Sequence, residues 1–263
     1  MALINSFENS GNTLFKYRGQ IPVLIFLLAI PVLWFSNQNF YLQLFVGNHH
    51  ILRIVMMVLA FAITISGLAL RAYTVSTTPK GTSGRNTSKQ VANHLNTTGI
   101  YSVVRHPLYL ANYLIWAGIL VFTMNVWAFI IVSLVYWIYY ERIMFAEEAF
   151  LRSRFGQEFE DWSAQVPAFV PNWSLFNAGD LKFSCKTFIR REYVTFFSTI
   201  FSYVVADYIM YILTYVRYFA YDVSPRSWVR PSLYVLVAAL IIMLIIRTIK
   251  HHTRWLSADA NRD

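Results

Sequence analysis

A stretch of 35 consecutive residues, from His106 to Tyr140, contains no Asp, Glu, Lys or Arg. A single helix of that length would be about 52 Å long, whereas the hydrocarbon core of a bilayer is about 30 Å thick. The stretch therefore predicts two membrane-spanning helices that fold back on each other near Thr123, Met124 and Asn125. Both charged ends of this hairpin then lie on one side of the membrane, where a site can be assembled from two distant pieces of sequence.

The composition is typical of an integral membrane protein. Of the 263 residues, 57% are hydrophobic and 13% are charged, whereas soluble domains average about 25% charged residues. One cysteine, Cys185, excludes a disulfide framework and a multi-cysteine metal site within the chain. The chain is expected to be an all-α polytopic membrane protein with about six transmembrane helices, at the apolar segments 20–36, 51–72, 107–123, 125–141, 192–216 and 231–247.

The net charge of +9 indicates membrane topology rather than a nucleic-acid-binding surface, because Lys and Arg stand at the ends of the apolar segments. The connection from Arg71 to Arg105 holds five basic residues, and the connection 37–50 holds none. The positive-inside rule places the basic connection in the cytosol, together with both termini. Three arginines between the last two apolar segments run against this rule.

Charged and aromatic motifs stand at both ends of the hairpin. Its entrance reads Gly-Ile-Tyr-Ser-Val-Val-Arg-His-Pro-Leu-Tyr over residues 99–109, and its exit carries Glu147 and Glu148. Farther along come Phe155-Gly156, Glu158-Phe159, Trp162 and a proline-containing segment at 166–171. This pattern resembles the superfamily of isoprenylcysteine carboxyl methyltransferases and phospholipid methyltransferases, which are membrane enzymes that use S-adenosylmethionine. The resemblance covers about residues 50–173.

The resemblance implies S-adenosylmethionine as methyl donor and indicates where it binds. The residues that fall at the cofactor positions of the family are Leu95, Asn96, Tyr101, His106, Pro107, Leu108, Tyr109 and Glu147. Their chemistry suits this ligand, because His106 and Tyr101 can bond a carboxylate or hydroxyls and Tyr109 can cover a sulfonium with its ring. Glu147 can neutralise the ammonium group. The sequence predicts no metal site.

The expected methyl acceptor is a membrane-embedded amphiphile, and its chemistry decides which residues act on it. A phosphate or carboxylate is already nucleophilic and needs a cation to place it, for which Arg142 and Arg105 are candidates. The resemblance also points to Arg142, although it lies one position out of register. An amine must lose a proton, and Glu148 is then the candidate base. The surplus of arginines favours phosphate or carboxylate, with an amine as the alternative.

Two other functions remain open at this point. A sterol-reductase-like enzyme with a nicotinamide cofactor shares part of this architecture, but such enzymes have a longer chain and more helices. A small transporter or membrane scaffold would use Asp207 as a relay, since it is the only charge among 24 residues from Tyr193 to Val216. Inverted repeats would favour a transporter, and none is evident. The structural alternative for Asp207 is a hydrogen bond to Tyr203 or Tyr211.

The chain divides into residues 1–75 with the first two transmembrane helices, a methyltransferase core at 76–173, and a C-terminal extension at 174–263 with two further helices. The stretch from Phe145 to Trp162 is expected to be one helix that leaves the membrane along its surface. The predicted location is the inner, plasma or endoplasmic reticulum membrane, with the active site and both termini facing the cytosol. The expected partner is a lipid or lipid-anchored substrate, and no oligomeric state is predicted.

Overall fold

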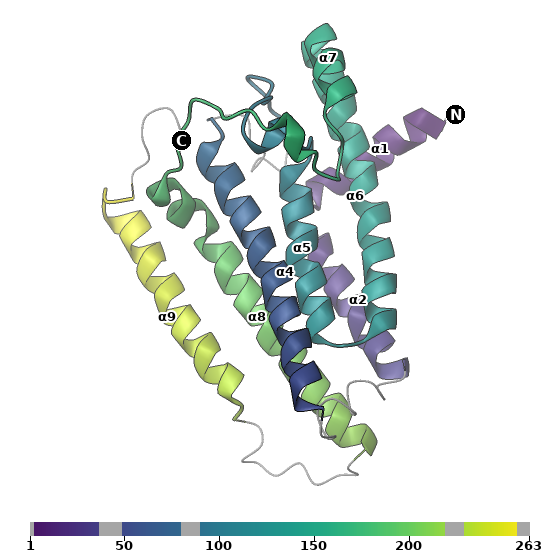
Figure 1. Cartoon of the computed structure of the whole chain (residues 1–263), viewed down its shortest axis with the longest axis vertical. Coiled ribbons are helices and arrows are strands. Elements are labelled where there is room, and N and C mark those ends of the chain that lie inside the picture. Colours follow the sequence, from purple (N-terminus) through teal and green to yellow (C-terminus); the bar gives the residue numbers. More distant parts are fainter. Residues whose placement is uncertain (1–2, 37–48, 80–89, 219–228, 257–263) are drawn as a thin grey trace.

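The computed structural model describes residues 3–36, 49–79, 90–218 and 229–256. Within these ranges the protein is all-α apart from one isolated β-bridge between Gly99 and Asn177. Among the described residues six helices are apolar: α2 (Ile21–Phe35), α4 (His50–Thr77), α5 (Pro107–Phe122), α6 (Val126–Phe155), α8 (Cys185–Tyr218) and α9 (Pro231–His252). Figure 1 shows them side by side. The predicted all-α membrane architecture is confirmed. Lys80, Arg85 and Lys89 of the basic connection lie outside the described residues.

The six apolar helices differ in length. Among the described residues, α4, α6, α8 and α9 are long and apolar enough to cross a membrane. Helices α2 and α5 are also apolar but have 15 and 16 residues. They correspond to about 22 to 24 Å of helix, which is shorter than the roughly 30 Å hydrocarbon core. The structure therefore contains four full-length candidate spans and two shorter apolar helices at the six predicted positions.

The predicted hairpin is formed by α5 and α6. Helix α5 begins at Pro107, where the missing N–H removes no hydrogen bond because the first turn has no intrahelical acceptor. Met124 has a φ of 52°, a left-handed conformation that reverses the chain after α5. The side chain of Asn125 then accepts a hydrogen bond from the Ala128 N–H at 2.8 Å and caps α6. The turn lies where the uncharged stretch predicted it.

Helix α6 continues for 30 residues and carries Glu147 and Glu148 beyond the end of the uncharged stretch. It ends at Phe155, and the next residue, Gly156, has a φ of 55°, which suits glycine. A second helix, α7 (Gln157–Gln165), then follows. The expectation of one helix from Phe145 to Trp162 was wrong, because Gly156 interrupts it. Figure 1 shows α7 at the end of α6, above the ends of the other apolar helices.

Helices α4 and α5 approach each other closely through two glycines. A Cβ atom on Gly67 would lie 2.7 Å from the carbonyl oxygen of Ala111. A Cβ atom on Gly118 would lie 2.5 Å from the carbonyl oxygen of Ala60 and would also meet the hydroxyl of Thr64. Small residues at such crossings allow two helix backbones to pack directly. This contact places the ends of α4 and α5 beside each other on the side that carries the predicted site.

Two further contacts complete the arrangement. The amphipathic helix α1 (Leu3–Lys16) lies against the charged half of α6, where the rings of Phe7 and Phe145 are 5.9 Å apart. In the C-terminal extension, both carboxylate oxygens of Asp207 accept hydrogen bonds from Arg230 at 2.7 Å. Ser232 donates to the same carboxylate at 2.7 Å. Asp207 is therefore paired, but the expectation of a tyrosine partner was wrong because α9 brings Arg230 to it.

Candidate functional site

The entrance motif is a structured turn held in place by the proline-containing segment. Residues 100–102 form one turn of 3-10 helix. The backbone N–H of Arg105 donates to the carbonyl of Pro167 at 2.9 Å. The N–H of His106 donates to the carbonyl of Ala168 at 3.2 Å. These bonds connect two of the sequence motifs directly and set the direction in which α5 begins.

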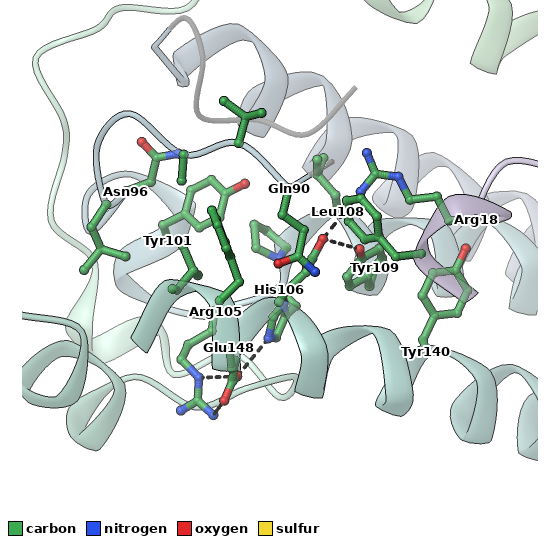
Figure 2. A pocket seen from close by; sticks show the side chains of 18 of the residues that line it. Arg18, Gln90, Asn96, Tyr101, Arg105, His106, Leu108, Tyr109, Tyr140 and Glu148 are labelled. Carbon is green, nitrogen blue, oxygen red and sulfur yellow. Dashed lines mark hydrogen bonds and ion pairs between the residues drawn. The ribbon is translucent and has the colours of Figure 1, made fainter. Parts of the chain in front are cut away.

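Glu148 accepts the hydrogen bonds of the charged cluster at the start of α5. Arg105 donates to its two oxygens from Nε at 2.8 Å and from Nη2 at 3.3 Å. His106 Nε2 lies 2.8 Å from Oε1, and Figure 2 shows both side chains converging on Glu148. Arg105 also donates from Nη1 to the carbonyls of Ser163 and Val166. This arginine therefore joins α5, α6 and the end of α7.

Glu147 points toward a different set of partners. The Tyr109 hydroxyl donates to its Oε1 at 2.7 Å. Arg18, from the connection between α1 and α2, places Nη1 at 3.5 Å from the same oxygen. His106 Nδ1 lies 3.7 Å from Oε2. His106 therefore stands between the two glutamates, with one ring nitrogen toward each.

The pKa values of the acidic groups beyond the apolar stretch move in opposite directions. Burial raises the pKa of Glu147, and His106, Tyr109 and Arg18 only partly oppose this effect. Burial also tends to raise the pKa of Glu148, but hydrogen bonds and charge from His106 and Arg105 outweigh it, so that this pKa is lowered. Glu148 is consequently held as a carboxylate.

A cavity of about 340 Å³ lies between these groups, within the range of roughly 300 to 1,000 Å³ typical of small-molecule sites. Tyr101 lines it, and burial followed by the charge of Glu147 raises the pKa of this hydroxyl above its usual range, which keeps it a donor. Arg105 and Glu148 line the cavity as well. So do all the residues predicted to bind the cofactor: Leu95, Asn96, Tyr101, His106, Pro107, Leu108, Tyr109 and Glu147.

Arg142 is the one predicted catalytic residue that the structure does not bring to the cavity. Its guanidinium lies 3.8 Å from the ring centroid of Phe7, and its Nη1 lies 3.5 Å from the hydroxyl of Ser10. Glu147 comes five positions after Arg142, which is about 140° around a helix of 3.6 residues per turn. The two side chains therefore leave α6 on different sides, and that of Arg142 contacts α1.

Two arginines that line the cavity were interpreted from the sequence only as topology charges. Arg18 lies between α1 and α2, and no local pattern connects it to the motifs. Arg71 lies in α4, six residues before the helix ends at Thr77. The predicted boundary at residue 72 made Arg71 look like a charge at the membrane edge. A charge inside an apolar helix was the signal that could have identified it.

A known protein family matches this same part of the chain, and individual proteins match about a third of the chain. The phospholipid methyltransferase family matches residues 49–158. The Protein-S-isoprenylcysteine O-methyltransferase of Schizosaccharomyces pombe is 38% identical over 86 residues, which are 32% of this chain and 36% of that protein. The nickel-cobalt-cadmium resistance protein NccN of Alcaligenes xylosoxydans xylosoxydans is 34% identical over 96 residues, 36% of this chain and 42% of that protein.

The family match covers α4, α5 and the whole of α6, and it leaves α8 and α9 outside. The chain spans less than half the length of the curated relatives it matches. No solved structure matches the chain. Within the described ranges, no group of three His, Cys, Asp or Glu side chains is placed to hold a metal ion.

Proposed function

Residues 49–158 belong to the superfamily of isoprenylcysteine carboxyl methyltransferases and phospholipid methyltransferases, and on this premise we propose that the protein methylates a membrane-embedded amphiphile with S-adenosylmethionine. The resemblance that the motifs indicated is thereby confirmed. One observation carries the proposal: the residues at the cofactor positions of the family, from Leu95 to Glu147, all line a single cavity. Two separate parts of the sequence meet there, as the hairpin predicted.

The residues of the cavity fit the parts of this methyl donor. Glu147 offers a carboxylate to the ammonium group. The ring of Tyr109 offers a face to the sulfonium, and Tyr101 and Asn96 offer a hydroxyl and an amide to polar groups of the ligand. When bound, S-adenosylmethionine would supply an electrophilic methyl group, which an acceptor oxygen or nitrogen takes while the sulfur keeps the electrons of the broken bond.

The environment of Glu148 favours an acceptor that needs no base. Its oxygens accept hydrogen bonds from Arg105 and His106, and its pKa is lowered, which makes it a weak proton acceptor. An amine acceptor would have to lose a proton, whereas a phosphate or carboxylate is already ionised near neutral pH. We therefore assign Glu148 and Arg105 to the positioning of His106, and we favour a lipid phosphate or carboxylate as acceptor.

We infer that the cavity faces the cytosol. The helix ends on its side carry the basic residues Lys16, Arg18 and Arg105, and the last turn of α9 adds Lys250. The positive-inside rule places such ends in the cytosol. This orientation also gives the cavity access to a water-soluble donor from one side, while the acceptor enters from the membrane.

Ligand binding and labelling test the proposal together. We expect detergent-solubilised protein to bind S-adenosylhomocysteine with micromolar affinity, about −8 kcal/mol, by calorimetry. With methyl-labelled S-adenosylmethionine and a membrane lipid extract, label should appear in a lipid. If the protein binds NADPH but neither S-adenosylmethionine nor S-adenosylhomocysteine, the sterol-reductase-like enzyme is favoured. Binding of none of the three would leave the transporter or scaffold as the better interpretation.

A further inference from the structure

A partly buried ion pair connects the cavity to the C-terminal extension. Arg71 of α4 donates from Nε to Oε2 of Glu192 in α8 at 2.5 Å. It also donates from Nη1 to Oδ1 of Asn112 in α5 at 2.8 Å. Arg71 and Asn112 line the cavity, whereas Glu192 does not and is 2% exposed. The guanidinium is therefore held at the cavity wall by a carboxylate that lies behind it.

Stability alone is a weak reason for this arrangement. Removing two charges from water costs several kcal/mol per ion, and their attraction offsets this only when the remaining hydrogen-bonding positions are satisfied. Oε1 of Glu192 is buried and accepts no hydrogen bond from any described residue. Among the described residues, no acceptor forms a hydrogen bond with Nη2 of Arg71. The pair is thus incompletely satisfied and keeps N–H donors available at the cavity wall.

The position of Arg71 separates it from the residues proposed to bind the donor. Its partner Asn112 stands five residues after the start of α5 at Pro107, about 8 Å farther along the helix axis. The donor residues occupy the loop from Leu95 to Tyr101 and the first turn of α5. Arg71 therefore lies on the part of the wall that is deeper in the bundle, toward the side from which a lipid enters.

We propose that Arg71, oriented by Glu192, binds the oxyanion of the methyl acceptor, a phosphate or carboxylate at the head of an amphiphile. The inference rests on the proposed methyl transfer. A guanidinium offers a planar set of donors, and with two N–H groups engaged by Glu192 and Asn112 its remaining donors match such an oxyanion. Because α8 lies outside residues 49–158, the C-terminal extension positions a residue of the acceptor site. Arg142, which contacts α1, has no part in it.

Binding of short amphiphiles in a neutral detergent tests this without methyl transfer. Dodecyl phosphate and dodecanoate represent the two oxyanion sources, dodecylamine is the cationic counterpart, and S-adenosylhomocysteine reports on the donor site. Arg71→Gln should weaken binding of the oxyanions about tenfold or more and leave S-adenosylhomocysteine affinity unchanged. Arg53→Gln is the matched control, since it lies on the same helix, changes the same charge and is 18 residues away from Arg71.

Two conservative variants separate positioning from folding. Glu192→Gln keeps the shape but removes the charge that orients the guanidinium, so it should lower oxyanion affinity and leave the donor site intact. Arg71→Lys keeps the positive charge but loses the planar donors, and it should bind dodecyl phosphate more weakly than wild type even if Arg71→Gln does not fold. Of dodecyl phosphate and dodecanoate, the one that wild-type protein binds more tightly identifies the acceptor class.

Three results would overturn the inference: unchanged oxyanion affinity in folded Arg71→Gln or Arg71→Lys, an equal loss in Arg53→Gln, or tighter wild-type binding of dodecylamine than of either oxyanion. Failure of the methyl-transfer proposal has a different signature. In that case wild-type protein would neither bind S-adenosylhomocysteine nor label a lipid, whatever the effect of Arg71 on dodecyl phosphate.

Discussion

Glu147 and Glu148 are adjacent in the sequence but have different neighbours in the structure. Consecutive residues on a helix point about 100° apart. Glu147 therefore meets Tyr109 and Arg18, whereas Glu148 meets Arg105 and His106. The first carboxyl lines the cavity and has a raised pKa. The second has a lowered pKa because Arg105 and His106 hold it as a carboxylate.

The affinity for the methyl donor should decrease as the pH is lowered, because Glu147 becomes protonated. The neutral carboxyl cannot pair with an ammonium group, so binding is complete above the pKa of Glu147 and is lost below it. Because burial raises this pKa, the loss should begin at higher pH than for an exposed glutamate, whose pKa is about 4.3. Calorimetry with S-adenosylhomocysteine measures it. Glu147→Gln should bind weakly at every pH, and the same pH profile in that variant would contradict the assignment.

His106→Ala should weaken S-adenosylhomocysteine binding by about 1.5 to 3 kcal/mol, because it removes a polar partner from a charged ligand in a poorly hydrated site. His251→Ala is the control, since this histidine is exposed at the end of α9. Calorimetry on both folded variants gives the comparison. Equal affinities would mean that the entrance motif only anchors the helix at the membrane surface.

Arg142→Lys distinguishes the sequence-based hypothesis from the observed contact. An arginine that orients the acceptor would lose most turnover on this change, because lysine lacks the planar donors. The guanidinium instead lies against Phe7 of α1, so we expect near-normal turnover and unchanged S-adenosylhomocysteine affinity. Kinetics of lipid labelling measure the outcome, and a strong loss of turnover in this variant would restore Arg142 as an acceptor residue.

At the scale of elements, the crossing of α4 and α5 holds the two walls of the cavity together. Helix α4 carries Arg71 and α5 carries Tyr109, so their separation determines the width of the site. Thr64 at this crossing also lies 2.7 Å from the hydroxyl of Tyr203 in α8. The same contact therefore joins residues 49–158, the family segment, to the C-terminal extension.

Gly118→Ala should lower the free energy of unfolding by about 1 to 3 kcal/mol, the usual cost of overpacking. The added methyl group would meet the Ala60 carbonyl and the Thr64 hydroxyl, and the helices would have to separate. Gly19→Ala is the matched control, because a Cβ atom there meets nothing within 4 Å. Thermal unfolding in detergent measures both. An equal melting temperature for the two variants would show that the crossing tolerates a wider spacing.

At the scale of the whole molecule, the cavity is assembled from more than the family segment. Residues 49–158 supply most of its lining. Arg18 enters it from before α2, and Glu192 supports it from α8. Segments outside the family match therefore contact residues that line the same cavity.

Cys185 provides a test of how the molecule lies in the membrane. It is exposed at the first residue of α8, on the same side as the cavity. In sealed cells an impermeant maleimide should not label it until the membrane is opened. In a Cys185→Ser background, His49→Cys at the opposite end of α4 should label in intact cells. The reverse pattern would show that the cavity faces outward.

The hairpin and the position of its turn could be predicted from the sequence alone. The residues proposed to bind the cofactor came from the family resemblance, and the structure places them around one cavity. The hairpin and its turn depend on local patterns: the length of an uncharged run and a proline at the start of a helix. The break at Gly156 was missed, because apolar periodicity does not record the backbone conformation of one glycine. Hydropathy also placed the end of the apolar segment that contains Arg71 at residue 72, whereas α4 continues to Thr77.

Only the tertiary structure decided which charged groups meet. Arg71 and Glu192 are 121 residues apart, and Arg18 and Glu147 are 129 apart. Asp207 finds Arg230 rather than a tyrosine on its own helix, because α9 packs beside α8 and places a guanidinium there. Such pairs depend on the rotation and depth of each helix against its neighbours. Those are set by side-chain packing across the bundle, which no pattern along a single helix contains.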